Sequence, residues 1–265
     1  MAVRSALINV MFSAADKASR RMMRDFGEVE NLQVSRKGAA DFVSQADLSA
    51  EETIREELEK SRPDWNFLME EGGAVENDKD APTWIVDPID GTTNYLHGIP
   101  HFAISIAVRQ NNKLTAGIVY DPCRNELFHA EQGTGAYVNG RRMRVSGRRN
   151  MSEALFATGI PFLGRGTDET DALFQAELNR VAKSSAGVRR FGAAALDLAW
   201  VAAGRYDGFW ERGLSCWDIA AGMVLVREAG GFVSDFAARD RSFETGDVVA
   251  ANSALHVPLL KALRG

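Results

Sequence analysis

Cysteine is scarce in this sequence. The 265 residues include only Cys123 and Cys216, which lie far apart and form no CxxC pair. This spacing argues against both a disulfide framework and a cysteine-rich zinc site. A chain that does not use disulfides suits a reducing compartment, so we expect a cytoplasmic protein.

Long apolar segments and repeats are also lacking. No apolar run approaches the length needed to cross a membrane. Residues 1–26 have apolar side chains at helical spacing, but charged residues interrupt them, so they lack the apolar centre of a signal peptide. Neither an internal repeat nor a low-complexity tract is present. We therefore expect no membrane association.

An excess of positive charge is absent as well. Lysine and arginine number 31 against 36 aspartates and glutamates, giving a net charge of -5 and no general affinity for nucleic acid. The most basic segment, residues 141–149, predicts a hairpin face in solvent, with contact to a polyanion as the alternative.

The patterns that are present predict a mixed α/β (α+β) protein. Residues 48–60 follow helical spacing, and residues 102–145 contain short alternating runs separated by turn signals, which indicates an antiparallel meander. Residues 146–265 alternate strand-like and helix-like segments, which indicates an α/β layer. We expect two halves, residues 1–145 and 146–265, packed as one compact unit.

One stretch combines features of a metal site and a phosphate site. Trp84, Ile85 and Val86 predict a buried strand that Pro88 ends, which leaves Asp87 at the strand end and Asp90 in the following loop. Carboxylates suit a hard cation such as Mg²⁺. The N–H groups of the next three residues could face an anion, especially if a helix begins there; they are Gly91, Thr92 and Thr93.

Each part of this stretch has a simpler interpretation. Asp-Pro and Asp-Gly alone are typical of turns. The apolar strand, two acids three residues apart and the double threonine together favour the metal and phosphate interpretation.

The stretch Asp-Pro-Ile-Asp-Gly-Thr-Thr-Asn at residues 87–94, followed by His97, resembles the metal-binding signature of the inositol monophosphatase family. Three further segments resemble the family in order and spacing, so the resemblance covers essentially the whole chain. These are the flap segment 41–47, with Ser44 in place of the usual threonine, the pair Glu70 and Glu71, and residues 217–231, with Trp-Asp-x-Ala-Ala-Gly and Glu-Ala-Gly-Gly.

The resemblance implies a layered αβαβα sandwich of the inositol monophosphatase and fructose-1,6-bisphosphatase type, commonly a homodimer. It also implies two to three Mg²⁺ ions between the halves. One ion would take Glu70, Asp87 and the carbonyl of Ile89, and a second would take Asp87, Asp90 and Asp218. A third, weaker ion would involve Glu70 through waters.

The resemblance also implies the roles of other residues in hydrolysis by direct attack of water. Thr92, oriented by Asp47, would relay a proton, and Glu70 would position the water. The backbone of Gly91, Thr92 and Thr93 would hold the phosphate. The substrate side would include Asp90, Ala194, Glu211 and Asp218. Glu71 is a weaker candidate that would act from outside the ligand shell.

From the residues alone, other roles stay open. Asp47 could cap a helix, in competition with a capping box of Ser49 and Glu52. The pair Glu70 and Glu71 could be a solvated turn. Asp218 could complement a helix dipole after a Ser215 cap, and Glu211 could simply be solvated.

We predict a Mg²⁺-dependent, lithium-sensitive phosphatase that hydrolyses inositol 1-phosphate. The alternatives within the superfamily are fructose-1,6-bisphosphatase, 3'-phosphoadenosine, NADP and histidinol phosphatases. A haloacid-dehalogenase type is disfavoured because its acids are two residues apart, not three. Residues 204–209 and 226–231 look especially like bacterial SuhB-type members, some of which bind RNA polymerase in transcription antitermination.

Two further motifs are not assigned functions. His97 and His101 have HxxxH spacing, but Gly98 and Pro100 argue against the helix that would align them on zinc. The Gly-x-Gly at residues 133–135 lacks the strand-to-helix context of a dinucleotide fold.

Overall fold

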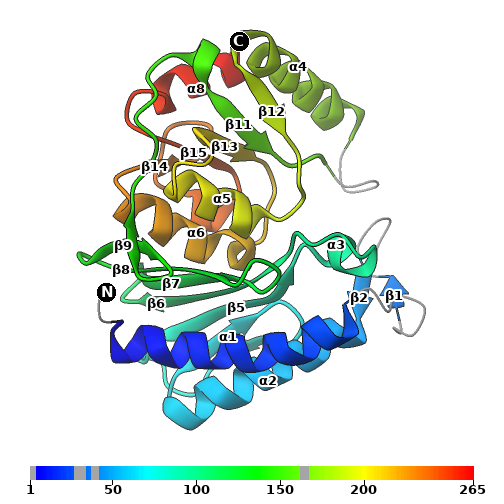
Figure 1. Cartoon of the computed structure of the whole chain (residues 1–265), viewed down its shortest axis with the longest axis vertical. Helices are drawn as coiled ribbons and strands as arrows, with labels where there is room; N and C mark the ends of the chain where they lie inside the picture. The colour runs from blue at the N-terminus through cyan, green and yellow to red at the C-terminus, as the bar shows by residue number, and fades with distance from the viewer. Residues whose placement is uncertain (1–3, 27–33, 37–41, 162–166) are drawn as a thin grey trace.

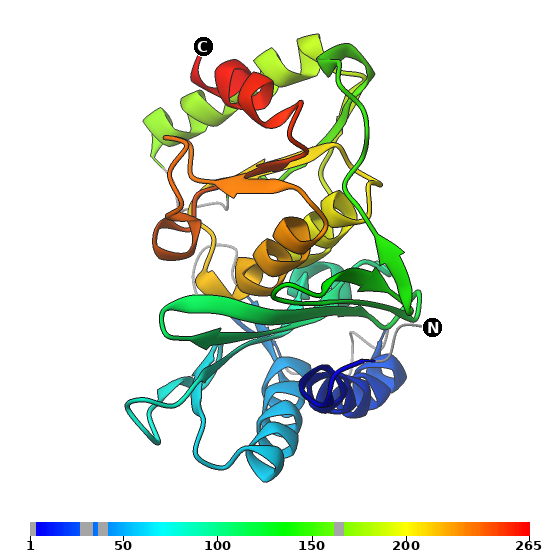
Figure 2. The same ribbon diagram turned by 90° about the vertical axis from the view of Figure 1, so that its left-hand side faces the viewer.

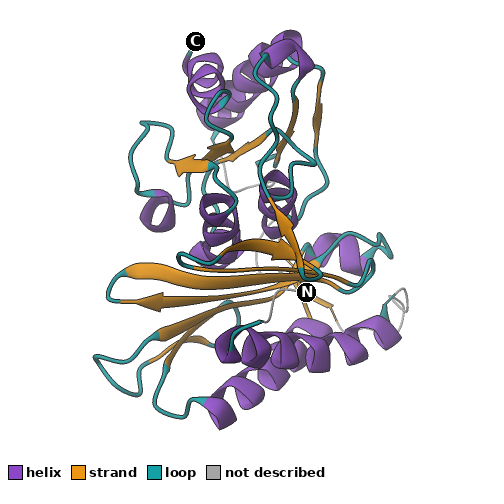
Figure 3. Cartoon of the chain, turned by 60° about the vertical axis from the view of Figure 1, so that its left-hand side comes forward, coloured by secondary structure: helices purple, strands orange, loops and turns teal. Residues whose placement is uncertain are grey.

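The fold consists of alternating layers of helix and sheet. The computed structural model describes residues 4–26, 34–36, 42–161 and 167–265. Helices α1 and α2 cover one face of a large sheet, and α5 and α6 lie between this sheet and a smaller one (Figure 1). Helices α4 and α8 cover the outer face of the smaller sheet (Figures 2 and 3). The predicted αβαβα sandwich is confirmed.

Most helices fall within or near the segments that the sequence predicts, and α7 was not predicted. Their bounds are α1 Ala6–Asp25, α2 Gln45–Ser61, α3 Thr92–Leu96, α4 Asp168–Ser184, α5 Ala194–Ala202, α6 Cys216–Glu228, α7 Ser242–Thr245 and α8 His256–Arg264, with a 3-10 turn at Met151–Glu153. Among the described residues, no helix combines the length and the apolar character needed to cross a bilayer.

The large sheet has eight strands in the order β10-β9-β8-β7-β6-β5-β3-β4. Consecutive strands from β5 to β10 pair antiparallel, which confirms the predicted meander. The bounds are β3 Asn66–Met69, β4 Gly73–Val75, β5 Thr83–Asp90, β6 Ala103–Gln110, β7 Lys113–Asp121, β8 Glu126–Glu131, β9 Gly135–Val138 and β10 Arg141–Met143.

The smaller sheet has five strands in the order β12-β11-β13-β15-β14. Their bounds are β11 Leu155–Thr158, β12 Gly187–Arg189, β13 Gly208–Glu211, β14 Phe232–Ser234 and β15 Val248–Ala251. A separate pair joins β1 Val34–Arg36 and β2 Phe42–Ser44. We propose residues 1–145 and 146–265 as the two halves, because the large sheet ends at Met143 and the smaller sheet begins at Leu155.

Strand β5 is buried on both faces, which explains its continuous apolar run. Trp84 and Val86 pack into the core between the large sheet and helices α1 and α2, whereas Ile85 packs into the core around α5 and α6. This alternation is the ordinary two-residue period of a strand. The strand therefore lies in the middle of the molecule, where its end can reach both halves.

Small residues let helix α6 pack closely on the large sheet. A Cβ at Gly117 in β7 would lie 2.8 Å from the Cα of Ala221 in α6. Gly222 makes a similar approach to α5, where a Cβ would lie 2.5 Å from the Cβ of Leu198. Because Asp218 is in the first turn of α6, these close contacts help to fix its position.

We expect Gly117→Ala to lower the free energy of unfolding by about 1 to 3 kcal/mol, because the added methyl group meets the helix backbone. Urea unfolding measures this change. Gly147→Ala is the matched control, since a Cβ at Gly147 would have no atom within 4 Å. Equal stability of the two variants would contradict the close packing of β7 on α6.

Candidate active site

The two acids of the central motif lie on an irregular part of β5. The expectation that Pro88 ends the strand is wrong, because β5 continues to Asp90. Its pairing with β6 changes register between Asp87 and Asp90, and proline has no N–H for the ladder. Asp87 therefore lies within the strand, and Asp90 is its last residue instead of a loop residue.

This irregularity affects which way the acids face. Residues three apart on a regular strand point to opposite faces. Here Asp87 follows the core alternation of Ile85 toward the α5 and α6 layer, and Asp90 accepts hydrogen bonds from α5. The register shift thus lets both carboxylates lie on the same side of the sheet.

Asp90 caps helix α5 across a long sequence separation. Its Oδ1 accepts from the N–H of Ala194 at 3.2 Å, and its Oδ2 accepts from Ala195 at 2.8 Å. The N-cap residue itself, Ala193, supplies no side-chain bond. Burial, and then the charge of Asp218, raise the pKa of Asp90 to about 7, although the helix N–H groups oppose this rise.

Asp87 is more deeply buried, with 1% of its surface exposed. Burial raises its pKa well above the ordinary value, and nearby acid charges raise it further. In decreasing order of effect these are Glu70, Asp90, Asp218 and Asp47. The structure thus brings together all five acids that the sequence assigned to the metal site and to proton transfer.

Glu70 reaches this cluster because β3 is parallel to β5. Met69 pairs with Val86, and the N–H of Glu70 donates to the carbonyl of Val86 at 3.2 Å. Glu70 therefore follows the end of β3 beside Asp87.

Asp218 lies in the first turn of α6, and the N–H of Ser215 donates to its Oδ2 at 2.8 Å. The predicted Ser215 cap and first-turn Asp218 are both confirmed.

Asp47 comes from helix α2. The alternative interpretation, in which it caps this helix, is wrong, because α2 begins at Gln45 and Asp47 lies within its first turn. The competing box of Ser49 and Glu52 is wrong for the same reason, since both residues lie inside the helix. Asp47 is 1% exposed, so its side chain points inward, where it interacts with the acid cluster.

The backbone after β5 turns directly into a short helix. Gly91 is the N-cap of α3 with φ +95°, and a Cβ there would lie 3.0 Å from the carbonyl oxygen of His101. The helix expected at this point is present, so the N–H groups of Gly91, Thr92 and Thr93 lie at a helix N-terminus. The hydroxyl of Thr92 donates to the carbonyl of Ile89 at 2.9 Å.

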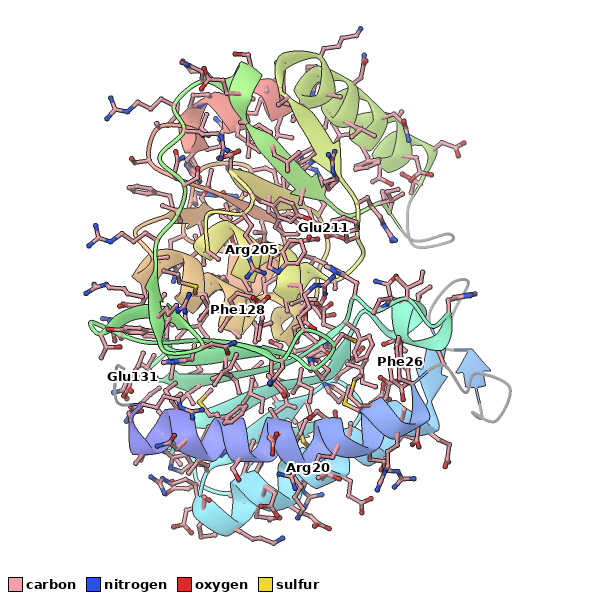
Figure 4. The ribbon with its side chains drawn as sticks, viewed as in Figure 1. Arg20, Phe26, Phe128, Glu131, Arg205 and Glu211 are labelled. Atoms are coloured by element: carbon pink, nitrogen blue, oxygen red, sulfur yellow. The ribbon has the colours of Figure 1, made fainter. Side chains whose placement is uncertain are left out.

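A cavity of about 340 Å³ adjoins the cluster on the side of the smaller sheet. It is lined by Asp218, by Glu211 at the end of β13, and by apolar residues such as Trp210. Figure 4 places Glu211 in the half of the molecule that carries this sheet. The carboxylate of Glu211 lies against the backbone of Gly159, where a Cβ would lie only 1.8 Å from its Oε1.

Burial raises the pKa of Glu211 to about 8, with further increases from Asp218 and Asp90 and a partial decrease from Arg190. In the absence of a cation, this carboxyl group therefore holds a proton at neutral pH. A protonated carboxyl can donate as well as accept a hydrogen bond, which suits contact with a hydroxyl group.

Two further acids near the site, Asp197 and Glu51, were not predicted from the sequence. Asp197, in the first turn of α5, is 1% exposed, and burial followed by the charges of Glu211 and Asp90 raises its pKa well above the ordinary value. The sequence feature that could have indicated Asp197 is a single acidic residue within an alanine-rich helix. Glu51 lies one helical turn after Asp47 and is buried, which four-residue spacing in α2 could have indicated.

The donor set fits a hard divalent cation. None of the described residues donates a hydrogen bond to Oδ1 of Asp87, although this oxygen is fully buried. The surrounding oxygen atoms that could bind a metal belong to carboxylates and a carbonyl, which Mg²⁺ prefers. In the described part of the chain, no three acid, histidine or cysteine side chains already surround one point as ligands. The carboxylates of Asp90 and Asp218 instead accept from helix N-termini.

Other expected features fall outside this site or outside the described residues. In the expected flap segment 41–47, Asp41 lies outside the described residues. His101 is buried, contacts Phe191 at a tilted angle and Trp200 edge to face, and has a pKa lowered by burial to about 4. His97 is exposed. Both remain structural residues in our interpretation.

Comparison with known proteins defines the family. The model of the inositol monophosphatase family matches residues 4–265. The chain belongs to the inositol monophosphatase family. It is 55% identical to an inositol-1-monophosphatase of Mesorhizobium japonicum over 98% of this chain and 97% of that protein.

Two other family members are similar over nearly their whole length. The chain is 44% identical to the Nus factor SuhB of Pseudomonas aeruginosa, covering 97% of this chain and 96% of that protein. The solved structure of the extragenic suppressor protein suhB from Bartonella henselae has a TM-score of 0.94 and 51% identity, covering 98% of this chain and 99% of that one.

The raised pKa of Glu211 predicts a specific pH dependence of stability. The unfolded chain releases this proton near the ordinary pKa of 4.5, whereas the folded protein releases it near 8. The folded state therefore binds more protons between these values, and stability should fall as the pH rises through them.

Glu211→Gln cannot ionise, so its stability should fall less over this range than that of the wild type. Thermal unfolding in EDTA between pH 5 and 8 measures the difference. The same pH dependence in both proteins would contradict the assignment of Glu211 as a partly buried acid with a raised pKa.

Proposed function

We propose that this protein is a Mg²⁺-dependent phosphomonoesterase that hydrolyses inositol 1-phosphate to inositol and phosphate. The observation that carries the proposal is the buried Asp87, surrounded by four other acids beside the N-terminus of α3. The similarity to a protein named inositol-1-monophosphatase supports the choice of substrate.

The residues that would hold Mg²⁺ come from the end of β3, from β5 and from α6. Glu70, Asp87 and the carbonyl of Ile89 would hold one ion, and Asp87, Asp90 and Asp218 would hold a second, with a weaker third near Glu70. When bound, the ions would lower the pKa of a water molecule and stabilise charge on the phosphoryl group in an in-line transfer. Burial of Asp87 makes an unneutralised cluster costly, which favours this occupation.

The protein groups would orient the reactants and move the proton. Glu70 would position the attacking water, and Thr92 with Asp47 would relay its proton. The hydroxyl of Thr92 already lies 2.9 Å from the carbonyl of Ile89, within reach of the cluster. The N–H groups of Gly91, Thr92 and Thr93 at the start of α3 would hold the phosphate oxygens.

The cavity beside Asp218 would receive the leaving group. Glu211 would contact its hydroxyl groups, and Asp90, Ala194 and Asp218 would line the side nearest the phosphate. The direct bond from Ala194 N–H to Asp90 supports their common location. Because Glu211 has a pKa of about 8 before any cation binds, it can donate a hydrogen bond to a polyol.

The test is phosphate release from several esters with Mg²⁺ or EDTA, for the wild type and Asp90→Asn. The wild type should hydrolyse inositol 1-phosphate only with Mg²⁺. The variant should lose at least about a hundredfold in activity, because even outer-shell substitutions at metal sites cost 10-fold to 100-fold. The other esters are fructose 1,6-bisphosphate, adenosine 3',5'-bisphosphate, NADP and histidinol phosphate.

The panel also separates the alternative phosphatase activities. Preference for one of the other esters would replace inositol 1-phosphate as the substrate while keeping the site. Hydrolysis in EDTA, or full activity of Asp90→Asn, would contradict the metal-dependent mechanism. No hydrolysis of any ester would contradict the phosphatase proposal itself.

A second role, contact with RNA polymerase in transcription antitermination, is supported by the relatives named Nus factor SuhB. Such a role can coexist with an intact catalytic site. Co-purification of RNA polymerase with both the wild type and Asp90→Asn would support binding that does not depend on catalysis. Absence of polymerase from both preparations would contradict it.

We also propose a lithium-sensitive cytoplasmic homodimer. Both cysteines are free, which suits a reducing compartment. Two exposed apolar residues adjoin Asn94, whose carbonyl accepts from the N–H of Ile99 and whose side chain donates to the carbonyl of Phe191. Ile99 is 48% and Phe191 42% exposed, and such neighbouring apolar groups suit contact with a second copy.

A further inference from the structure

A buried glutamate of α2 holds the turn that follows Glu70. Oε2 of Glu51 accepts from the N–H of Glu71 at 2.8 Å, and Oε1 accepts from the N–H of Gly72 at 2.7 Å. Glu51 is only 6% exposed. Two successive backbone donors thus converge on one carboxylate, which gives short, charge-assisted hydrogen bonds.

This turn lies at the edge of the large sheet. It joins β3 to β4, and β4 is a three-residue edge strand. Strand β3 pairs with β5, and the N–H of Glu70 donates to the carbonyl of Val86. The two hydrogen bonds to Glu51 connect the same turn to helix α2.

The fit between Glu51 and the turn is close. A Cβ at Gly72 would lie 3.0 Å from Oε1 of Glu51 and 2.9 Å from Cε of Met69. The absence of a side chain at Gly72 lets the carboxylate approach the backbone directly. The hydrogen bonds from the backbone to Glu51 therefore depend on glycine at position 72.

The spacing within α2 connects this contact to the acid cluster. Glu51 follows Asp47 by four residues, so both side chains lie on the same face of the helix, and both are buried. One helix thus supplies Asp47 to the cluster and fixes the turn that carries Glu70.

We propose that Glu51 is a positioning residue that holds Glu70 in place for Mg²⁺ binding. This inference rests on the proposed metal-dependent function. Glu51 acts through the backbone of Glu71 and Gly72, not by touching the ion or the substrate. Loss of its hydrogen bonds lets the turn move and weakens the metal site.

Glu51→Gln tests this role with almost no change in size. The amide keeps one acceptor oxygen but turns an NH₂ group toward the second backbone N–H, so only one of the two bonds can survive. Isothermal titration with Mg²⁺ should show binding that is about 10-fold to 100-fold weaker, as for other outer-shell partners of metal ligands. Glu52→Gln is the matched control, because Glu52 is the exposed neighbour with the same charge.

A double-variant comparison shows whether Glu51 acts through Glu70. In a Glu70→Gln background, Glu51→Gln should cause little further loss of Mg²⁺ affinity, because the ligand that it positions is already gone. Glu51→Asp retains the charge but not the reach, so it should also bind Mg²⁺ more weakly than the wild type. Thermal unfolding in EDTA reports separately on the stability of each variant.

Mg²⁺ affinity of Glu51→Gln within twofold of the Glu52→Gln control would overturn the inference. Wild-type affinity in Glu51→Asp would also overturn it, because charge alone would then suffice. If Glu51→Gln does not fold, the Asp variant gives the decision by the same titration. If the wild type itself binds no Mg²⁺, the proposed function fails instead, which is a distinct result.

Discussion

The structure depends on keeping several like charges together in a buried place. Asp87 lies almost wholly out of water, and four other acids raise its pKa further. Such a cluster is unfavourable unless its members are protonated, hydrogen-bonded or neutralised by a cation. The protein partly offsets the cost by directing backbone N–H groups at Asp90 and Asp218. The remaining cost makes a divalent cation a strongly favoured ligand.

The layers of the fold converge on this cluster. The register shift around Pro88 lets Asp87 and Asp90 serve the same face of the large sheet. The close packing of α6 on β7 fixes Asp218 from the other half. Helix α2 supplies Asp47 from beneath the sheet. The acids thus come from the large sheet and from helices on both of its faces.

Much of this organisation could be predicted from the sequence. Period-two and helical patterns predicted the meander and most helices, and the resemblance to the inositol monophosphatase family implied the members of the cluster. The strand through Pro88 was mispredicted because a proline without an N–H is accommodated by a local register shift that no periodicity reveals. The alternative role of Asp47 as a helix cap is wrong because α2 begins two residues before it, at Gln45. Glu51 was missed because its partners are backbone groups twenty residues away, which only the folded chain brings close.

The most direct test is the thermal stability of the wild type and Asp87→Asn at pH 8, in EDTA and with Mg²⁺. Mg²⁺ should stabilise the wild type by about 2.7 kcal/mol at a hundred times its dissociation constant. Asp87→Asn should be more stable than the wild type in EDTA, because Asn has no acid group whose pKa is raised on folding, and it should gain much less from Mg²⁺. A wild type whose stability is the same with and without Mg²⁺, or an equal gain in both proteins, would contradict the buried acids as a cation site.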